Sequence, residues 1–249
     1  MFLATTMDRN KSQKMREVIM KTIGLIGGMS WESSSEYYRI INEEVKKQLG
    51  GLHSAKCILY SVDFDEIERY QAEGDWESAG KKLGEVALSL EKAGAAFIVI
   101  CTNTMHKVID YIQEKIQIPV LHIAEATANH IQKSNIKTVG LLGTKYTMEQ
   151  DFYKSRIESN GLKVIIPDQG ERNIVNQVIY DELCLGEIRQ SSKDYYQKVM
   201  ESLVDKGAEG IILGCTEIGL LVKQEDSKVP LFDTTVIHAI EAVQTALRK

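Results

Sequence analysis

The stretch KTIGLIG at residues 21–27 returns as KTVGLLG at residues 137–143. Each is a short apolar run that ends in glycine, which is typical of a buried strand in a parallel sheet. Two more stretches repeat in the same order: AGAAFIVICT at 93–102 pairs with KGAEGIILGC at 206–215, and IPVLH at 118–122 pairs with VPLFD at 229–233. Three matches at nearly constant spacing indicate two copies of one unit.

Strand-like and helix-like segments alternate in each copy. Helical spacing of apolar residues follows each opening run, and the remaining segments keep the order strand, helix, strand. This order predicts an α/β protein with parallel sheets and right-handed crossovers. We therefore expect two pseudo-symmetric parallel-sheet α/β domains that face each other across a central cleft. The expected helices are 31–48, 76–93, 147–160 and 190–206, and the expected strands are 22–27, 57–62, 97–101, 138–143, 163–166 and 210–214.

The order of the repeats bears on where the domains begin and end. The run at 118–122 comes just before the second copy, and the run at 229–233 comes last. If the copies are equivalent, the last run and its helix return to the first domain, so that the chain crosses between the domains twice. We predict a first domain of residues 21–116 plus 217–249, a second domain of 117–216, and an N-terminal extension of 1–20.

Composition excludes several classes of protein. The net charge is −5 and no basic cluster stands out, so nucleic acid is not expected as a partner. No apolar run approaches the roughly 18 residues that span a membrane, and the start of the chain does not have the pattern of a secretory signal. The four cysteines have no close-pair metal spacing, so no metal is expected and a cytoplasmic location is favoured. GGMS at 27–30 is not a GxGxxG motif, and no nucleotide site is predicted.

The stretch CTNTMHK at 101–107 holds a thiol and a hydroxyl at the end of an apolar run. Two registers between the copies are conceivable, but matching Thr102 with Cys215 also aligns the upstream Gly-Ala pairs. Neighbouring residues of a strand point to opposite faces. We therefore expect Thr102 and Cys215 in the cleft and Cys101 in the core.

Three motifs carry a resemblance to a known family. TIGLIGGMS at 22–30, TNTMH at 102–106 and GCTEI at 214–218 together resemble the cofactor-independent aspartate/glutamate racemases, and most closely the bacterial L-aspartate/glutamate-specific ones. The resemblance covers essentially residues 20–249. In that family the first motif reads Cys-Asn-Thr-x-His, so Thr102 occupies its cysteine position. Glu217 favours the aspartate-like branch over the glutamate racemases, which more often have histidine there.

The resemblance implies a reaction. Two thiols, one from each domain, flank the α-carbon in that family, and they remove and return a proton on opposite faces without pyridoxal phosphate. Here it implies conversion of L-aspartate and/or L-glutamate to the D-form, with Cys215 as thiolate base and Thr102 in place of the second cysteine. A hydroxyl is a far weaker acid than a thiol, so Thr102 needs a neighbour or water to relay a proton. The alternative role for Thr102 is a hydrogen bond to the substrate.

Substrate oxygens need hydrogen-bond donors, and the resemblance places several candidates at strand ends. Local turn capping is the alternative for most of them. Gln71 is a neutral substitute near a family arginine position, and Arg172 lies beside a family lysine position but could equally be a solvated loop residue. His106 has a structural or a proton-transfer role, and Glu217 could orient a neighbour or tune Cys215. The predicted substrate-binding residues are Met29, Ser30, Gln71, Asn103, Thr104, Thr144, Thr216 and Arg172.

Two other functions remain open from the sequence. A single-thiol enzyme of the same superfamily, such as a malonate-type decarboxylase, would use one cleft cysteine to protonate an enediolate. A binding protein for an acidic amino acid would keep the cleft and lose the base. A homodimer is common in the family, but no feature of this sequence requires it.

Overall fold

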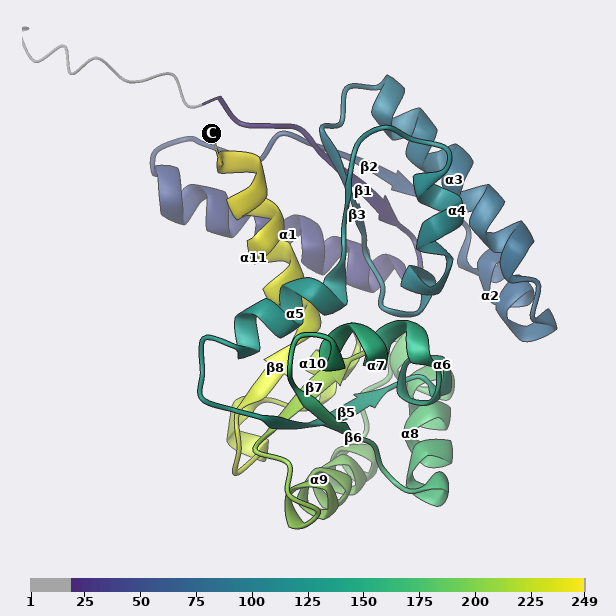
Figure 1. The fold of residues 1–249 in the computed structure, drawn as a ribbon, viewed down its shortest axis with the longest axis vertical. Coiled ribbons are helices and arrows are strands. Elements are labelled where there is room, and N and C mark those ends of the chain that lie inside the picture. Colours follow the sequence, from purple (N-terminus) through teal and green to yellow (C-terminus); the bar gives the residue numbers. More distant parts are fainter. Residues whose placement is uncertain (1–18, 249) are drawn as a thin grey trace, which may run out of the picture.

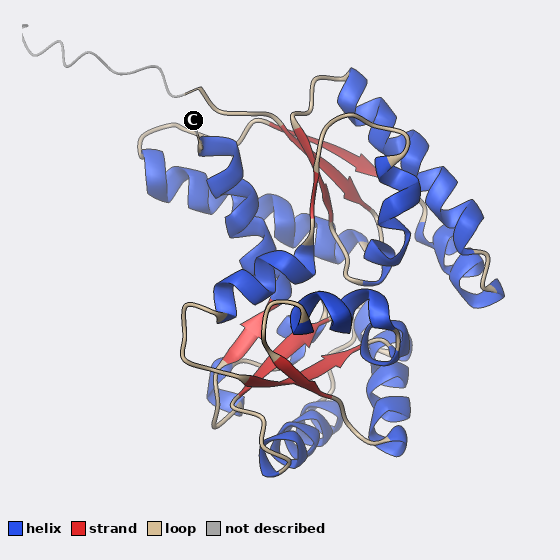
Figure 2. Cartoon of the chain, in the orientation of Figure 1, coloured by secondary structure: helices blue, strands red, loops and turns tan. Residues whose placement is uncertain are grey.

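The computed structural model describes residues 19–248 and contains two four-stranded sheets with helices packed around them (Figures 1 and 2). All pairings within both sheets are parallel. The strand orders are β2-β1-β3-β4 and β6-β5-β7-β8, so the two sheets have the same topology. This confirms the predicted fold class of two similar α/β units.

The first sheet is formed by the N-terminal half of the described chain. Its strands are β1 (Ile23–Gly27), β2 (Cys57–Ser61), β3 (Phe97–Ile100) and β4 (Val120–Leu121). The helices of this half are α1 (Trp31–Leu49), α2 (Phe64–Glu73), α3 (Trp76–Lys92), the 3-10 helix η1 (Thr104–Val108), α4 (Ile109–Gln113) and α5 (Ile123–Ile131).

The second sheet repeats the arrangement. Its strands are β5 (Thr138–Gly143), β6 (Lys163–Ile165), β7 (Gly210–Gly214) and β8 (Leu231–Asp233). Its helices are α6 (Lys145–Glu149), α7 (Asp151–Glu158), α8 (Gln169–Asp181), η2 (Leu183–Leu185), α9 (Gln190–Asp205), α10 (Ile218–Leu221), η3 (Gln224–Asp226) and α11 (Thr234–Leu247). The helix expected at 147–160 is thus two helices that meet at Gln150, and the first of them is capped by the side chain of Thr144.

The predicted domain boundaries are wrong for two strands. β4 pairs with β3 in the first sheet, where Val99 lies beside Leu121, and β8 pairs with β7 in the second sheet, where Leu213 lies beside Asp233. Each sheet is therefore completed by the strand that follows it most closely along the chain, which is the common outcome for consecutive strands. The strand at 229–233 does not return to the first domain.

The last helix does return to the first domain, as predicted. In Figure 1, α11 runs beside α1 at the first sheet, and α5 lies at the junction of the two units. One face of α11 is fully buried in a core shared with Tyr37 and Ile41 of α1. Three residues of that face are Ala239, Ala242 and Val243. The chain therefore crosses between the units once through α5 and once through α11.

The structure describes the chain from Ile19 onward. The extension predicted for residues 1–20 lies outside the described residues except for Ile19 and Met20. Met20 is buried against the core of the first domain, and the backbone N–H of Lys21 donates to Ala246 of α11. No helix within residues 19–248 has the length and apolar character needed to cross a membrane.

Candidate active site

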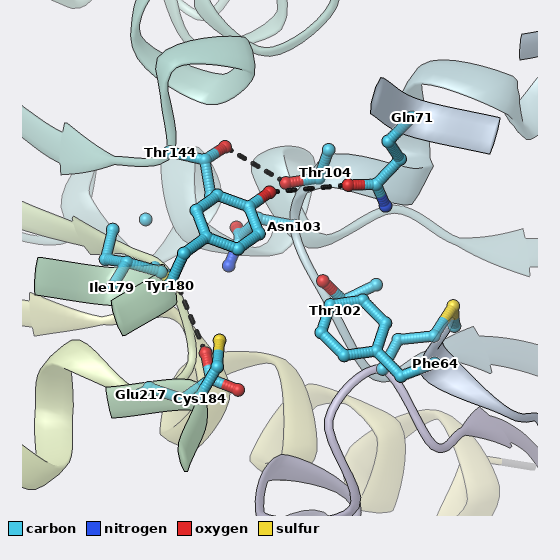
Figure 3. Close-up of a pocket in the computed structure, with 13 residues that line it drawn as sticks. Phe64, Gln71, Thr102, Asn103, Thr104, Thr144, Ile179, Tyr180, Cys184 and Glu217 are labelled. Atoms are coloured by element: carbon cyan, nitrogen blue, oxygen red, sulfur yellow. Dashed lines mark hydrogen bonds between the residues drawn. The ribbon is translucent and has the colours of Figure 1, made fainter. Parts of the chain in front are cut away.

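A cleft of about 360 Å³, including open solvent at its mouth, lies where the carboxyl ends of strands from both sheets meet (Figure 3). Ligands in open parallel sheets bind beyond these strand ends. Segments that follow β1, β3, β5 and β7 all reach it. Its lining residues are Met29, Phe64, Gln71, Thr102, Asn103, Thr104, Thr144, Ile179, Tyr180, Cys184, Gly214, Cys215 and Glu217.

Thr102 and Cys215 stand at equivalent places in the two units. Thr102 follows β3 and Cys215 follows β7, and both line the cleft. Cys101, by contrast, is fully buried in the core beneath α1, where burial raises the pKa of its thiol. The predicted orientation of this stretch is confirmed: the hydroxyl lies at the cleft and the neighbouring thiol lies in the core.

The Glu217 carboxylate collects three hydrogen bonds beside Cys215. The thiol of Cys215 donates to Oε2 at 3.1 Å, Thr216 Oγ1 donates to Oε2 at 2.8 Å, and Ser30 Oγ donates to Oε1 at 2.7 Å. Burial, and after it the negative charge of Glu217, raises the pKa of the Cys215 thiol well above its ordinary value. The thiol is therefore protonated at neutral pH and points its hydrogen at a carboxylate.

A tight turn after β1 brings Ser30 to Glu217. Gly28 in this turn has φ of +93°, and a Cβ added to it would lie 2.2 Å from the carbonyl oxygen of Val62. Only glycine fits this approach. The turn places Met29 in the cleft lining and Ser30 at the N-cap of α1, where its hydroxyl also accepts from Ser33 N–H.

Hydroxyl groups of the two units meet at one wall of the cleft. Thr104 Oγ1 lies 3.1 Å from Thr144 Oγ1 (Figure 3). Thr144 Oγ1 in turn lies 3.2 Å from Thr147 Oγ1. Thr144 also caps α6, so the capping role foreseen as an alternative is present together with a place in the cleft. The pair Thr104–Thr144 links the first domain to the second directly at the site.

The amide orientation of Asn103 follows from its partner. Thr234 Oγ1 donates its single hydrogen to the Leu213 carbonyl oxygen at 2.8 Å, so it accepts from Asn103 Nδ2 at 3.0 Å. Asn103 Oδ1 is then a buried acceptor with no hydrogen-bond partner among residues 19–248. A buried acceptor of this kind costs free energy unless a bound group fills it.

His106 has a structural position. Its Nδ1 donates to the Thr102 carbonyl oxygen at 2.8 Å, and its Nε2 accepts from Ile123 N–H at 3.2 Å. Burial lowers the pKa of His106 to about 4, so the ring is neutral. Both ring nitrogens are therefore hydrogen-bonded to backbone groups, and the ring connects Thr102 to the start of α5. His106 does not line the cleft.

Of the remaining predicted substrate-binding residues, one lines the cleft and three do not. Gln71 lines the cleft, whereas Ser30 and Thr216 lie behind Glu217 and do not. Arg172 is held outside it by Glu149 Oε1 at 2.8 Å and the Pro167 carbonyl oxygen at 2.7 Å. Within residues 19–248, no cluster of three His, Cys, Asp or Glu side chains is placed to hold a metal ion.

Several lining residues escaped sequence reasoning. Phe64 begins α2, Ile179 and Tyr180 lie in α8, and Cys184 lies in η2. None belongs to a repeated strand end or to a motif, which are the signals that pointed to the other residues. Tyr180 donates to Gln71 Oε1 at 3.4 Å, and Tyr146 donates to the Gln71 carbonyl oxygen at 3.2 Å, so this group also spans the two units.

Known proteins are similar to this chain in fold and in sequence. A crystal structure from Yersinia pestis, provisionally assigned as an Asp/Glu racemase, is 58% identical with a TM-score of 0.86, and the match covers 92% of this chain and 100% of that one. An aspartate racemase homologue from Pyrococcus horikoshii OT3 is 36% identical with a TM-score of 0.80 over the same shares. The broad specificity amino-acid racemase RacX of Bacillus subtilis (strain 168) is 27% identical over 90% of this chain and 98% of its own length.

These matches define an enzyme of the amino-acid racemase class, whose members are isomerases. More particularly, the chain belongs to the Asp/Glu/hydantoin racemase family, whose model matches residues 26–242. The family resemblance of the three sequence motifs is thereby confirmed.

Proposed function

We propose that this enzyme inverts the α-carbon of an amino acid by proton transfer from two sides of the cleft, without pyridoxal phosphate. Cys215 works on one face and Thr102 on the other. The observation that carries the proposal is the equivalence of these two residues, which follow β3 and β7 and line one cleft. The family description makes conversion of L-aspartate and/or L-glutamate to the D-form the first reaction to test.

Cys215 and Glu217 act as a pair in this proposal. The Sγ proton passes to Glu217 Oε2, and the thiolate then removes the α-proton of the substrate. Because the pKa of the Cys215 thiol is raised by burial and by Glu217, the thiolate is scarce but strongly basic. The proton held by Glu217 returns to solvent before the next turnover.

Thr102 supplies the proton on the other face. Its hydroxyl donates to the α-carbon while it takes a proton from a water molecule in the cleft, so that no free alkoxide forms. This relay is less effective than a second thiol. We therefore expect an asymmetric enzyme, in which the enantiomer that meets Cys215 first reacts faster, and the family resemblance makes this the L-form.

Polar groups at the strand ends hold the substrate backbone in this proposal. The unpartnered Asn103 Oδ1 accepts from the substrate ammonium, and Thr104, whose oxygen accepts from the Thr144 hydroxyl, donates its own hydroxyl hydrogen to the α-carboxylate. Donors aimed at this carboxylate stabilise the negative charge that develops when the α-proton leaves.

The test is a racemisation assay with chiral separation of products. Purified enzyme is incubated separately with the L- and D-forms of aspartate, glutamate and a panel of other amino acids. Formation of the opposite enantiomer by the wild type, with loss in Cys215→Ala, is the expected result. Tight binding without any conversion would instead identify a binding protein and overturn the proposal.

A further inference from the structure

The charged groups that line the cleft indicate which kind of substrate side chain it can bind. Within residues 19–248, the lining contains no lysine, arginine or histidine. Its one charged side chain is Glu217, which is 3% exposed and accepts its hydrogen bonds from two hydroxyls and a thiol. A second carboxylate on the substrate would therefore find no positively charged partner in this lining.

Cations on neighbouring segments lie outside the lining of the cleft. Arg172 is engaged by Glu149, and the Lys107 ammonium lies over the ring of Trp76, 3.6 Å from its centroid. Lys145 lines a separate outer groove together with Glu68 and Glu149. None of the three contributes to the cleft lining, so none is in place to pair with a distal carboxylate.

The part of the cleft away from the ends of β3, β5 and β7 has an apolar or neutral wall. It is formed by Met29 of the turn after β1 and by Phe64, Ile179, Tyr180 and Cys184. Burial raises the pKa of both the Tyr180 phenol and the Cys184 thiol, so both are uncharged at neutral pH. This wall offers van der Waals contact and no ionic partner.

The polar groups at this wall are already hydrogen-bonded within the protein. The Tyr180 hydroxyl donates its only hydrogen to Gln71 Oε1 (Figure 3). Gln71 Nε2 donates to Met105 Sδ at 3.0 Å. The remaining amide hydrogen of Gln71 could satisfy a neutral side chain. A single neutral donor does not replace the bidentate or ionic contacts that proteins use to hold a buried carboxylate.

We infer that the side-chain end of this cleft selects amino acids with uncharged side chains over aspartate and glutamate. The inference rests on the proposed racemase function and names the substrate class of that same site. The α-carboxylate and ammonium keep their partners at the strand ends, and only the distal group is discriminated.

The direct test compares amino acids that match in size and differ in charge. Wild-type enzyme in deuterium oxide is given L-asparagine against L-aspartate and L-glutamine against L-glutamate, with L-methionine as an apolar reference. Entry of deuterium at the α-carbon gives kcat/KM for each. The expected result is that the best uncharged substrate exceeds both acids at least tenfold, a difference of about 1.4 kcal/mol.

The outcomes separate the two claims. Exchange of aspartate or glutamate at a rate equal to or above that of every uncharged substrate would overturn the inference and leave the racemase function standing. Absence of exchange with every amino acid in the panel would overturn the racemase function, and the inference with it.

A charge placed in the wall gives a second, independent readout. Phe64 is partly exposed at the start of α2, so Phe64→Arg puts a cation at the cleft with little burial cost, and Phe64→Met is the matched uncharged control. The ratio of kcat/KM for aspartate over asparagine should rise at least tenfold in Phe64→Arg and stay within about threefold in Phe64→Met. If the ratio of kcat/KM for aspartate over asparagine were unchanged in a folded Phe64→Arg enzyme, the inference would be contradicted. A comparison of Cys184→Lys with Cys184→Met repeats the test from the second domain.

Discussion

The hydroxyl of Ser30 donates a 2.7 Å hydrogen bond to the carboxylate of Glu217, which joins the turn after β1 in the first unit to the end of β7 in the second. The other oxygen of the same carboxylate accepts from the Cys215 thiol. Glu217 therefore takes part both in a contact between the two halves and in raising the pKa of the thiol.

Replacing Glu217 should change the thiol directly. In Glu217→Gln the negative charge that helps to raise the pKa of Cys215 is gone, so the thiolate should form at lower pH. The amide cannot take the thiol proton, and we expect α-proton exchange to fall at least tenfold. Rates of alkylation by iodoacetamide across pH, with Cys184→Ala as the background, measure the shift.

Ser30→Ala is the control for the same network. It removes one hydrogen bond to the carboxylate and leaves the charge in place, so the pH midpoint of alkylation should move less than in Glu217→Gln. A larger movement in Ser30→Ala would mean that the position of Glu217, and not its charge, sets the pKa of the thiol.

A second thiol should restore symmetry. Thr102→Cys places a sulfur at the position in the first unit that corresponds to Cys215, and a thiol exchanges protons near neutral pH far more readily than a hydroxyl. The rate from the D-enantiomer should rise at least tenfold, while the rate from the L-enantiomer changes less. Thr102→Ser keeps the hydroxyl and serves as the matched control, in which the asymmetry should persist.

Buried histidines predict a loss of stability in acid. Burial lowers the pKa of His106 to about 4 and that of His238 to about 3, whereas an unfolded histidine titrates near 6.5. Between the folded and unfolded pKa values the unfolded chain binds more protons than the folded protein. The free energy of unfolding is therefore highest above about pH 6.5 and declines as the pH falls toward 4. At pH 5 the loss is about 2 kcal/mol for each histidine.

Urea unfolding at pH 7.5 and pH 5 measures this effect. His106→Asn should reduce the difference between the two pH values, although the variant is less stable at both. Removal of the exposed His53 by His53→Gln should leave the difference unchanged. An equal loss in all three proteins would show that other groups cause the acid sensitivity.

The packing of α11 against α1 depends in part on a hydrogen bond from the Tyr37 hydroxyl, so we expect its removal to lower the free energy of unfolding. Tyr37 Oη lies 2.9 Å from Nδ1 of the buried His238, whose Nε2 donates to the Leu121 carbonyl oxygen at 3.0 Å, so the phenol is the donor to Nδ1. Tyr37→Phe leaves that nitrogen unsatisfied and should cost about 1–3 kcal/mol of unfolding free energy. Tyr38→Phe, on the exposed side of the same helix, should cost less than about 0.5 kcal/mol.

Sequence repeats predicted the strands and the facing of the residues at their ends, because strand formation and side-chain alternation are local properties. KTIGLIG and KTVGLLG form β1 and β5, and the alternation of a strand assigns Thr102 to the cleft and Cys101 to the core. The pairing of β8 was not predictable in this way, since the two copies offer equivalent neighbours and the repeat alone does not choose between them. The helix that follows β8 is shared by the two units, and the strand is not.

The side-chain end of the cleft was largely invisible in the sequence. Phe64, Tyr180 and Cys184 come from helical segments of both units, and their place at the cleft depends on how the two units pack together. Arg172 looked suitable by its position in the chain, but its guanidinium is bound by Glu149 and a carbonyl oxygen. Such contacts depend on tertiary structure, and no spacing rule reveals them.

The central claim is that Cys215 and Thr102 serve opposite faces of one α-carbon, and deuterium entry at that carbon tests it most directly. Proton NMR in deuterium oxide would compare L- and D-substrates with the wild type, Cys215→Ala, Thr102→Ala and Cys101→Ala. We expect faster exchange from the L-side, loss of this exchange in Cys215→Ala, weaker inversion in Thr102→Ala and wild-type rates in Cys101→Ala. Full activity in Cys215→Ala, or loss of activity in a folded Cys101→Ala, would contradict it.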